Sequence, residues 1–163
     1  MGIFVADVSF RTPDLPVWGQ TVLGTDFRLG PGGKGSNQAV AAARLGSKVY
    51  FIGKTGDDAF GRMAHDLYDK EGVDQRFLFQ STEYATGAAA IIVDNATGEN
   101  AIIVTPGAGN TLTHEEIDSA KDQIRESRVF LTQLELPLNT VEYGLKLARE
   151  FGVATILNPA PGC

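Results

Sequence analysis

Short apolar runs alternate along the chain with segments in which apolar residues recur at helical spacing. Four runs are rich in β-forming residues and have the length of strands: 2–10, 48–52, 127–134 and 153–157. The spacing between them predicts three helices: 36–45, 57–70 and 113–126. A further helix is predicted to begin at Pro137. This alternation of strand and helix predicts βα units and a mainly parallel sheet.

Polar residues mark where two of these helices begin. Asp57 is predicted to be the N-cap of the second helix, because a short polar side chain can accept a hydrogen bond from the free N–H groups of the first turn. Thr113 and Glu116 have the spacing of a capping box at the start of the third helix. Capping accounts for both residues without a role in catalysis.

A hairpin and two loops complete the pattern. Residues 87–94 and 100–105 are β-rich and flank a turn-forming Asn-Ala-Thr-Gly, which predicts a hairpin. The two prolines within residues 12–19 predict a loop, and residues 21–29 read as a short extended segment. Trp18, the only tryptophan, is expected to pack against the protein rather than stack on a ligand.

Composition narrows the class of protein. The chain has 163 residues, of which 43% are hydrophobic, as in soluble globular domains. A net charge of −6 disfavours a nucleic-acid partner, and no apolar run reaches the roughly 18 residues of a membrane span. Cys163 is the single cysteine, which excludes an internal disulfide and, with two histidines, leaves no metal-binding cluster of these residues. Because no signal peptide is evident either, we expect a cytoplasmic protein.

The most distinctive polar stretch is residues 29–46, which continues from a glycine cluster into a helix of small residues. The cluster contains Gly30, Gly32, Gly33 and Gly35. Glycines allow positive φ and let a ligand approach the main chain, and the helix directs free N–H groups at the loop. Lys34, Ser36 and Asn37 add side-chain donors. These features favour a binding loop for a polar ligand over a tight turn without one.

Two nucleotide-binding motifs fail on this loop. The letters G-x-G-x-x-G are present from Gly30, but the acidic residue required about 20 positions later is missing, since the next strand ends in Gly53. A Walker A loop needs Ser or Thr after Gly-Lys, and here Lys34 is followed by Gly35. The loop is therefore not predicted to bind a nucleotide phosphate.

Two acidic residues stand at strand positions where a site could form. Asp7 interrupts the first apolar run, which fits either a solvent-facing position or a ligand-binding one. Glu135 follows the strand over residues 127–134, and ligands of open α/β sheets bind at the carboxyl ends of strands. An acid favoured by the dipole of the following helix is the alternative for Glu135.

The residues of four segments carry a family resemblance. Residues 31–46, with Gly-Gly-Lys-Gly-Ser-Asn-Gln at their centre, resemble the first signature of the ribokinase family of carbohydrate kinases. Residues 53–61, 131–137 and 158–161 also resemble segments of that family. The resemblance implies an α/β, three-layer ribokinase-like fold with a mainly parallel central sheet. It also implies a small β-sheet lid formed by strands around 3–27 and 87–105.

The resemblance also implies a function. Family members transfer the ATP γ-phosphate to a primary hydroxyl of ribose or a related sugar. Asp7 and Asn37 would then bond sugar hydroxyls by side chain and Gly33 by backbone, Lys34 would position the loop, and Glu135 would support the site. Residues 1–163 match the N-terminal, sugar-binding half of the family, so the C-terminal half is expected to be absent from this chain.

The expected absence extends to the catalytic machinery. The family's catalytic Asp stands in a Gly-Ala-Gly-Asp signature, whereas the Gly-Ala-Gly of residues 107–109 precedes Asn110 on the hairpin side of the fold. No catalytic, cofactor-binding or metal-binding residue is therefore predicted here, and the sites for ATP, Mg²⁺ and K⁺ are expected mostly in the other half. The chain alone is expected to be inactive.

The partners implied are a small-molecule sugar and a second copy joined through the lid sheet in a homodimer, with no nucleic acid and no membrane. Two alternatives stay open. The chain could be a non-catalytic sugar-binding or dimerising fragment, or part of a kinase for another sugar or a nucleoside.

Overall fold

Two parallel strand pairs and the N-terminal segment form the middle layer of the protein. The structure, a computed structural model, describes residues 1–161, so Cys163 lies outside the described residues. The paired strands are β3 (Tyr50–Gly56) with β4 (Asp74–Ser81), and β7 (Val129–Gln133) with β8 (Ala154–Asn158). Residues 1–2 lie between the pairs, because the Gly2 N–H donates to the Ile52 carbonyl at 3.1 Å and the Met1 amino group donates to the Leu131 carbonyl at 2.8 Å.

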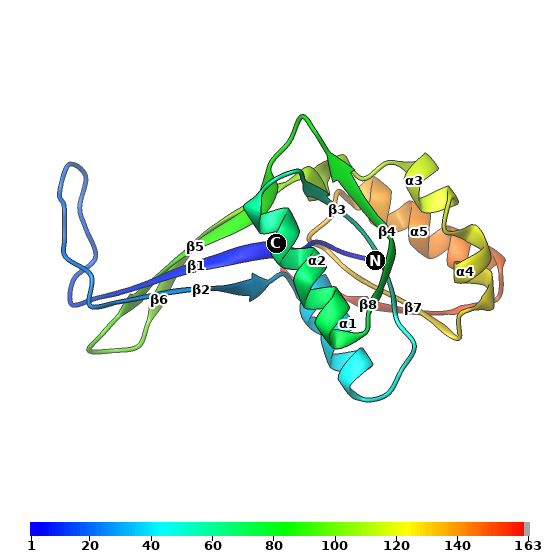
Figure 1. The fold of residues 1–163 in the computed structure, drawn as a ribbon, viewed down its shortest axis with the longest axis horizontal. Helices are drawn as coiled ribbons and strands as arrows, with labels where there is room; N and C mark the ends of the chain where they lie inside the picture. Colours follow the sequence, from blue (N-terminus) through cyan, green and yellow to red (C-terminus); the bar gives the residue numbers. More distant parts are fainter. Residues whose placement is uncertain (162–163) are drawn as a thin grey trace.

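Helices cover both faces of this layer (Figure 1). They are α1 (Lys34–Arg44), α2 (Ala59–Glu71), α3 (His114–Asp118), α4 (Lys121–Glu126) and α5 (Leu138–Glu150). The first residues of the chain show the division, because Ile3 and Val5 belong to the core beneath α3–α5, and Phe4 belongs to the core beneath α1 and α2. This alternation is that of an extended strand buried on both sides. The predicted three-layer α/β fold with a mainly parallel central sheet is confirmed.

A second sheet projects from this body, and we call it the lid sheet (Figure 1). Its strands are β1 (Val5–Thr12), β2 (Asp26–Gly32), β5 (Thr86–Asp94) and β6 (Asn100–Gly107), in the order β2-β1-β5-β6. β1 pairs parallel with β5, and the two outer pairs are antiparallel. Because β1 continues directly from the buried residues 1–4, one extended run of chain joins the body to the lid sheet. The 3₁₀ helix η1 (Ala108–Thr111) leads from β6 back to the body.

Several local expectations were wrong. The N-cap of α2 is Asp58 and not Asp57, since the Asp58 side chain accepts the Gly61 N–H. The single helix expected over 113–126 is two short helices, α3 and α4. β4 was not predicted at all. Trp18 packs against nothing, because its relative exposure is 104% in the loop between β1 and β2.

Candidate functional site

The glycine loop ends where α1 begins, and Gly33 is the N-cap residue of that helix. Its φ of 92° lies in a region that side chains avoid, and a Cβ there would stand 2.5 Å from the Ile3 carbonyl oxygen. Glycine is therefore required twice, by backbone conformation and by space. The close approach of the loop to Ile3 also allows a hydrogen bond, because the Ser36 N–H donates to the Ile3 carbonyl at 3.3 Å. The loop is thereby fixed against the buried N-terminal segment.

Glu135 closes the loop from the other side. One carboxylate oxygen accepts the Lys34 backbone N–H at 2.7 Å, and the other accepts the Lys34 ammonium at 2.8 Å. The Glu135 side chain is only 11% exposed, whereas that of Lys34 is 40% exposed. A carboxylate at the first N–H of a helix is stabilised by the hydrogen bond and by the helix dipole. Glu135 thus satisfies a free N–H of α1 and joins residues that lie 101 positions apart.

Asp7 stands on β1 next to this pair. Its carboxylate lies where a side chain at Gly32 would be, so glycine at that position makes room for it. Burial raises the pKa of Asp7, and the nearby negative charge of Glu135 raises it further. Two carboxylates therefore converge beside the loop, with the Lys34 ammonium bound to one of them.

Asn37 lies in the first turn of α1, three residues after Lys34, and is exposed. Among the described residues its side-chain amide has no hydrogen-bond partner, whereas its backbone N–H donates to Gly33 within the helix. The structure therefore brings Asp7, Gly33, Lys34 and Glu135 together at the start of α1, and Asn37 follows one turn along. Carboxylate acceptors beside amide and ammonium donors can bind adjacent hydroxyl groups, each of which both donates and accepts.

Sequence reasoning missed a second polar cluster at the base of the lid sheet. The Asp58 carboxylate accepts the Gly61 N–H at 2.8 Å, the Thr86 N–H at 2.7 Å and the Thr86 hydroxyl at 2.8 Å. Burial works to raise the pKa of Asp58, but the hydrogen bonds from Thr86 and Gly61 hold it below its ordinary value. Asp58 therefore ties the first residue of β5 to the start of α2. The signal was present in the Gly-x-x-Gly-x-Asp-x-x-Gly spacing of residues 53–61, whose Asp is Asp58.

The described residues offer little to a metal. Across residues 1–161, His, Cys, Asp and Glu side chains nowhere gather in threes as ligands. None of the helices in this range has both the length and the apolar character needed to cross a bilayer.

Comparison with known proteins identifies the family. A family model described as pfkB family carbohydrate kinase matches residues 1–162. The chain belongs to the pfkB family of carbohydrate kinases. Among relatives of this pfkB chain, the ribokinase of Mus musculus is 39% identical over 162 residues, which are 99% of this chain and 50% of the relative. The ribokinase of Bacillus subtilis is 41% identical over 155 residues, 95% of this chain and 52% of the relative.

Solved structures agree with the pfkB assignment. The structure of Arabidopsis thaliana ribokinase complexed with ribose and ATP superposes with a TM-score of 0.86 at 28% identity, covering 98% of this chain and 52% of that one. The chain thus spans about half the length of the curated relatives it matches. The family and the fold are shown, and the role of each site residue stays a prediction.

Proposed function

We propose that this chain is the sugar-binding half of a cytoplasmic, ATP-dependent kinase that phosphorylates the primary hydroxyl of ribose or a closely related sugar. The observation that carries the proposal is the convergence of Asp7, Glu135 and Lys34 on the N-terminus of α1. The names of the relatives support it, since they are ribokinases.

In the proposed site, Asp7 and Asn37 bind sugar hydroxyls with their side chains, and Gly33 does so with its backbone. Lys34 and Glu135 hold the loop in place rather than contact the reacting atoms. The Asp7 carboxylate accepts hydroxyl protons best when it is ionised, so its raised pKa makes ribose affinity fall on acidification sooner than it would for an ordinary Asp.

Phosphoryl transfer also needs a nucleotide, a metal ion and a group that takes the hydroxyl proton. In this proposal the sites for ATP, Mg²⁺ and K⁺ lie mostly on residues outside this chain. The chain itself binds and orients the sugar, and phosphorylation requires the rest of the protein.

The direct test is titration calorimetry of the 163-residue chain with ribose. We expect saturable binding without ATP, and loss of that binding in Asp7→Ala. Asp26→Asn is the matched control, because Asp26 is an exposed acid of the same sheet that bonds only its own neighbours Phe27 and Arg28. Unchanged ribose binding by Asp7→Ala would remove Asp7 from the site.

A second sugar is favoured by one comparison. The deoxyribokinase of Salmonella typhimurium is 35% identical over 161 residues, 99% of this chain and 52% of the relative. The same titration with 2-deoxyribose separates the two substrates. Tighter binding of 2-deoxyribose than of ribose would assign the deoxysugar. Two further outcomes would favour the alternatives. Sugar binding by this chain without phosphorylation by the longer protein would favour a non-catalytic sugar-binding fragment. Tighter binding of another sugar or of a nucleoside would favour part of a kinase for that substrate.

We also propose a homodimer formed through the lid sheet. The register places Phe10 of β1 opposite Phe27 of β2, and Leu29 and Ile103 lie in the adjacent row on the same face. These four side chains are 43%, 55%, 46% and 70% exposed. Asp7 lies on the opposite face, because successive residues of a strand alternate. An exposed apolar face of this kind is typical of a protein contact, and a second copy would cover it while leaving the Asp7 face to the sugar.

A further inference from the structure

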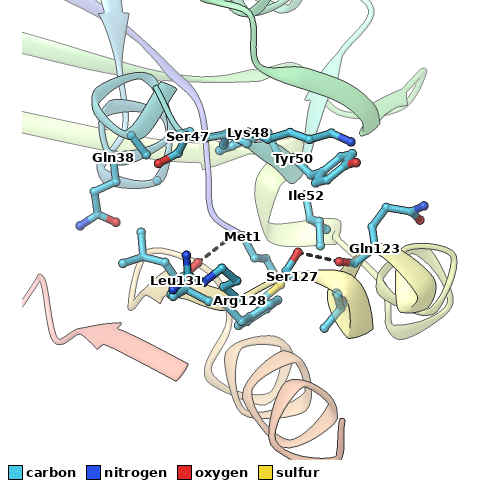
Figure 2. A pocket seen from close by; sticks show the side chains of 18 of the residues that line it. Met1, Gln38, Ser47, Lys48, Tyr50, Ile52, Gln123, Ser127, Arg128 and Leu131 are labelled. Carbon is cyan, nitrogen blue, oxygen red and sulfur yellow. Dashed lines mark hydrogen bonds between the residues drawn. The ribbon is translucent and has the colours of Figure 1, made fainter. Parts of the chain in front are cut away.

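A buried amide lies against the first turn of α1. Gln133 is the last residue of β7, and only 1% of its surface is exposed. Its side-chain N–H donates to the side-chain oxygen of Gln38 at 2.5 Å. Figure 2 shows the Gln38 side chain extending from α1 in the direction of β7, which is marked there by Leu131. Among residues 1–161 the Gln133 side-chain oxygen has no hydrogen-bond partner, and an unpaired buried oxygen costs free energy, so stability alone does not explain this amide.

Two glycines allow α1 to approach this amide. Gly35 of α1 packs against Gly2, because a Cβ on Gly35 would stand 2.7 Å from the Gly2 Cα. The same Cβ would stand 2.8 Å from the Gln133 side-chain oxygen. The N-terminal segment, α1 and β7 therefore meet at one point without side chains between them, and this contact brings Gln38 within reach of Gln133.

Two polar contacts join the same face of α1 to the end of β7. Gln38 follows Lys34 by four positions, and side chains at this spacing lie on one helix face, about 6 Å apart along the axis. Gln133 precedes Glu135 by two positions, which span about 7 Å in an extended chain. Because Lys34 donates to Glu135 and Gln133 donates to Gln38, the two contacts match in spacing. One contact fixes a single point of α1, whereas two contacts one turn apart also fix the rotation of the helix about its axis.

The rotation of α1 determines where the groups of the candidate sugar site point. We propose that Gln133 is a positioning residue that holds α1 in the rotation at which the Lys34 N–H meets Glu135 and the Asn37 side chain faces the sugar. Gln133 acts through Gln38 and does not contact the sugar itself. This role rests on the sugar-binding function proposed for the chain, and it extends that function to a residue outside the glycine loop.

Ribose titration of Gln133→Leu tests this role, with Thr132→Val as the matched control. Thr132 is the neighbouring residue of β7, is fully buried and has no side-chain partner among the described residues, but its side chain lies on the opposite face of the strand. We expect ribose affinity to fall about tenfold in Gln133→Leu and to stay unchanged in Thr132→Val, at a temperature where circular dichroism shows both chains folded. Equal affinities of the two variants would overturn the proposal.

Gln133→Glu separates positioning from packing, because its side chain keeps the size of the amide, and it decides the question if Gln133→Leu does not fold. The protonated carboxyl group donates a hydrogen bond to Gln38 as the amide does, whereas the ionised group has no proton to donate and is opposed by burial. We expect its ribose affinity to match that of the unmodified chain at acidic pH and to become progressively weaker than it as the pH rises. A constant ratio of the two affinities between about pH 5 and 9 would contradict the positioning role.

Hydrogen exchange of the Lys34 N–H, followed by NMR, gives a readout without sugar. Because the bond of this N–H to Glu135 depends on the rotation of α1, we expect exchange about tenfold faster in Gln133→Leu than in Thr132→Val. The rates are compared with that of the Asp74 N–H, which makes a backbone hydrogen bond at the start of β4. An unchanged rate would refute the positioning role. Faster exchange in a chain that binds no ribose would support the placement of α1 and refute the proposed function instead.

Discussion

Two single residues, one in the N-terminal segment and one packed against it, constrain the local structure most clearly. Gly33 tolerates no side chain because of both its φ and its distance to the Ile3 carbonyl. Met1 places its amino group in a buried position, and this burial lowers the pKa of the group. Each case gives a measurable effect on stability that a comparison of matched variants can isolate.

Gly33→Ala is expected to destabilise the fold by about 3 kcal/mol, because a strained φ costs of order 1–3 kcal/mol and the new Cβ also displaces the Ile3 carbonyl. Gly46→Ala is the control, since Gly46 has a φ of +85° and no heavy atom within 4 Å of the added Cβ. It should cost only the conformational part, on the order of 1 kcal/mol. Urea unfolding measures both, and equal losses would refute the steric argument.

The buried amino group predicts a pH dependence of stability. Its pKa is about 5 in the folded chain against an ordinary 8.0, so between pH 5 and 8 the unfolded state binds more protons. The free energy of unfolding therefore rises with pH across this window, by up to about 4 kcal/mol for three pKa units. Urea unfolding at pH 5, 6, 7 and 8 should show a steeper rise for the free amino terminus than for an acetylated one. Parallel curves would mean that the amino group is solvated.

At the scale of elements, the sequence predicts a helix boundary best where residues a few positions apart determine it. The capping box of Thr113 and Glu116 is present as predicted, because its two hydrogen bonds join residues three positions apart. The break between α3 and α4 was not predicted, and at the break the Ser119 hydroxyl donates back to the Glu116 carbonyl at 2.6 Å. Adjacent acids at 57 and 58 are equally good caps by residue type, and only the glycine spacing of residues 53–61 distinguishes Asp58 in the sequence.

Two other features that the sequence did not predict are the strand β4 and the contact between Glu135 and Lys34. β4 escaped prediction because its first residues are polar, and Asp74 and Arg76 form a surface ion pair at 2.8 Å instead of an apolar pattern. About half of the candidate site could be predicted from the sequence. The loop and its acids could be named from spacing and resemblance, whereas the bidentate contact of Glu135 with Lys34 joins residues that no sequence pattern connects.

Asp58 is expected to contribute more to the stability of the fold than its position in a turn suggests. Asp58→Ala removes the cap of α2 and leaves the Thr86 donors without a partner, for a loss of about 3 kcal/mol in the free energy of unfolding. The loss should shrink at acidic pH, because protonation of Asp58 weakens the same bonds in the unmodified chain. Asp57→Ala is the control, with one long contact to Gln80 at 3.4 Å and an expected change below about 0.5 kcal/mol. Similar losses would contradict the anchoring role.

At the scale of the whole molecule, the two faces of the lid sheet differ in the residues they present. One carries Asp7 toward the glycine loop, and the other exposes the row that contains Phe10 and Phe27, whose ring centroids are 5.3 Å apart. The body beneath consists of two strand pairs held together at one end by residues 1–2. In the proposal, a second copy and a sugar would therefore bind to opposite faces of the same four strands.

The proposed dimer is tested by Phe27→Asp. A charge in the centre of the apolar face should convert the dimer into a monomer in sedimentation equilibrium, because the carboxylate would be desolvated in the contact. Ile102→Asp is the matched control, as Ile102 is 51% exposed on the same sheet but on the Asp7 face. A monomeric unmodified chain, or dissociation by Ile102→Asp instead, would exclude this interface.

The unbroken run from residue 1 to Thr12 has a mechanical consequence. Its first part is clamped between β3 and β7, and its second part is an inner strand of the lid sheet. Because hydrogen bonds hold this extended run at both ends, we expect a displacement of the lid sheet to pass into the body along it. The glycine loop contacts this run at the Ile3 carbonyl, so a movement of the run would reach the loop at that contact.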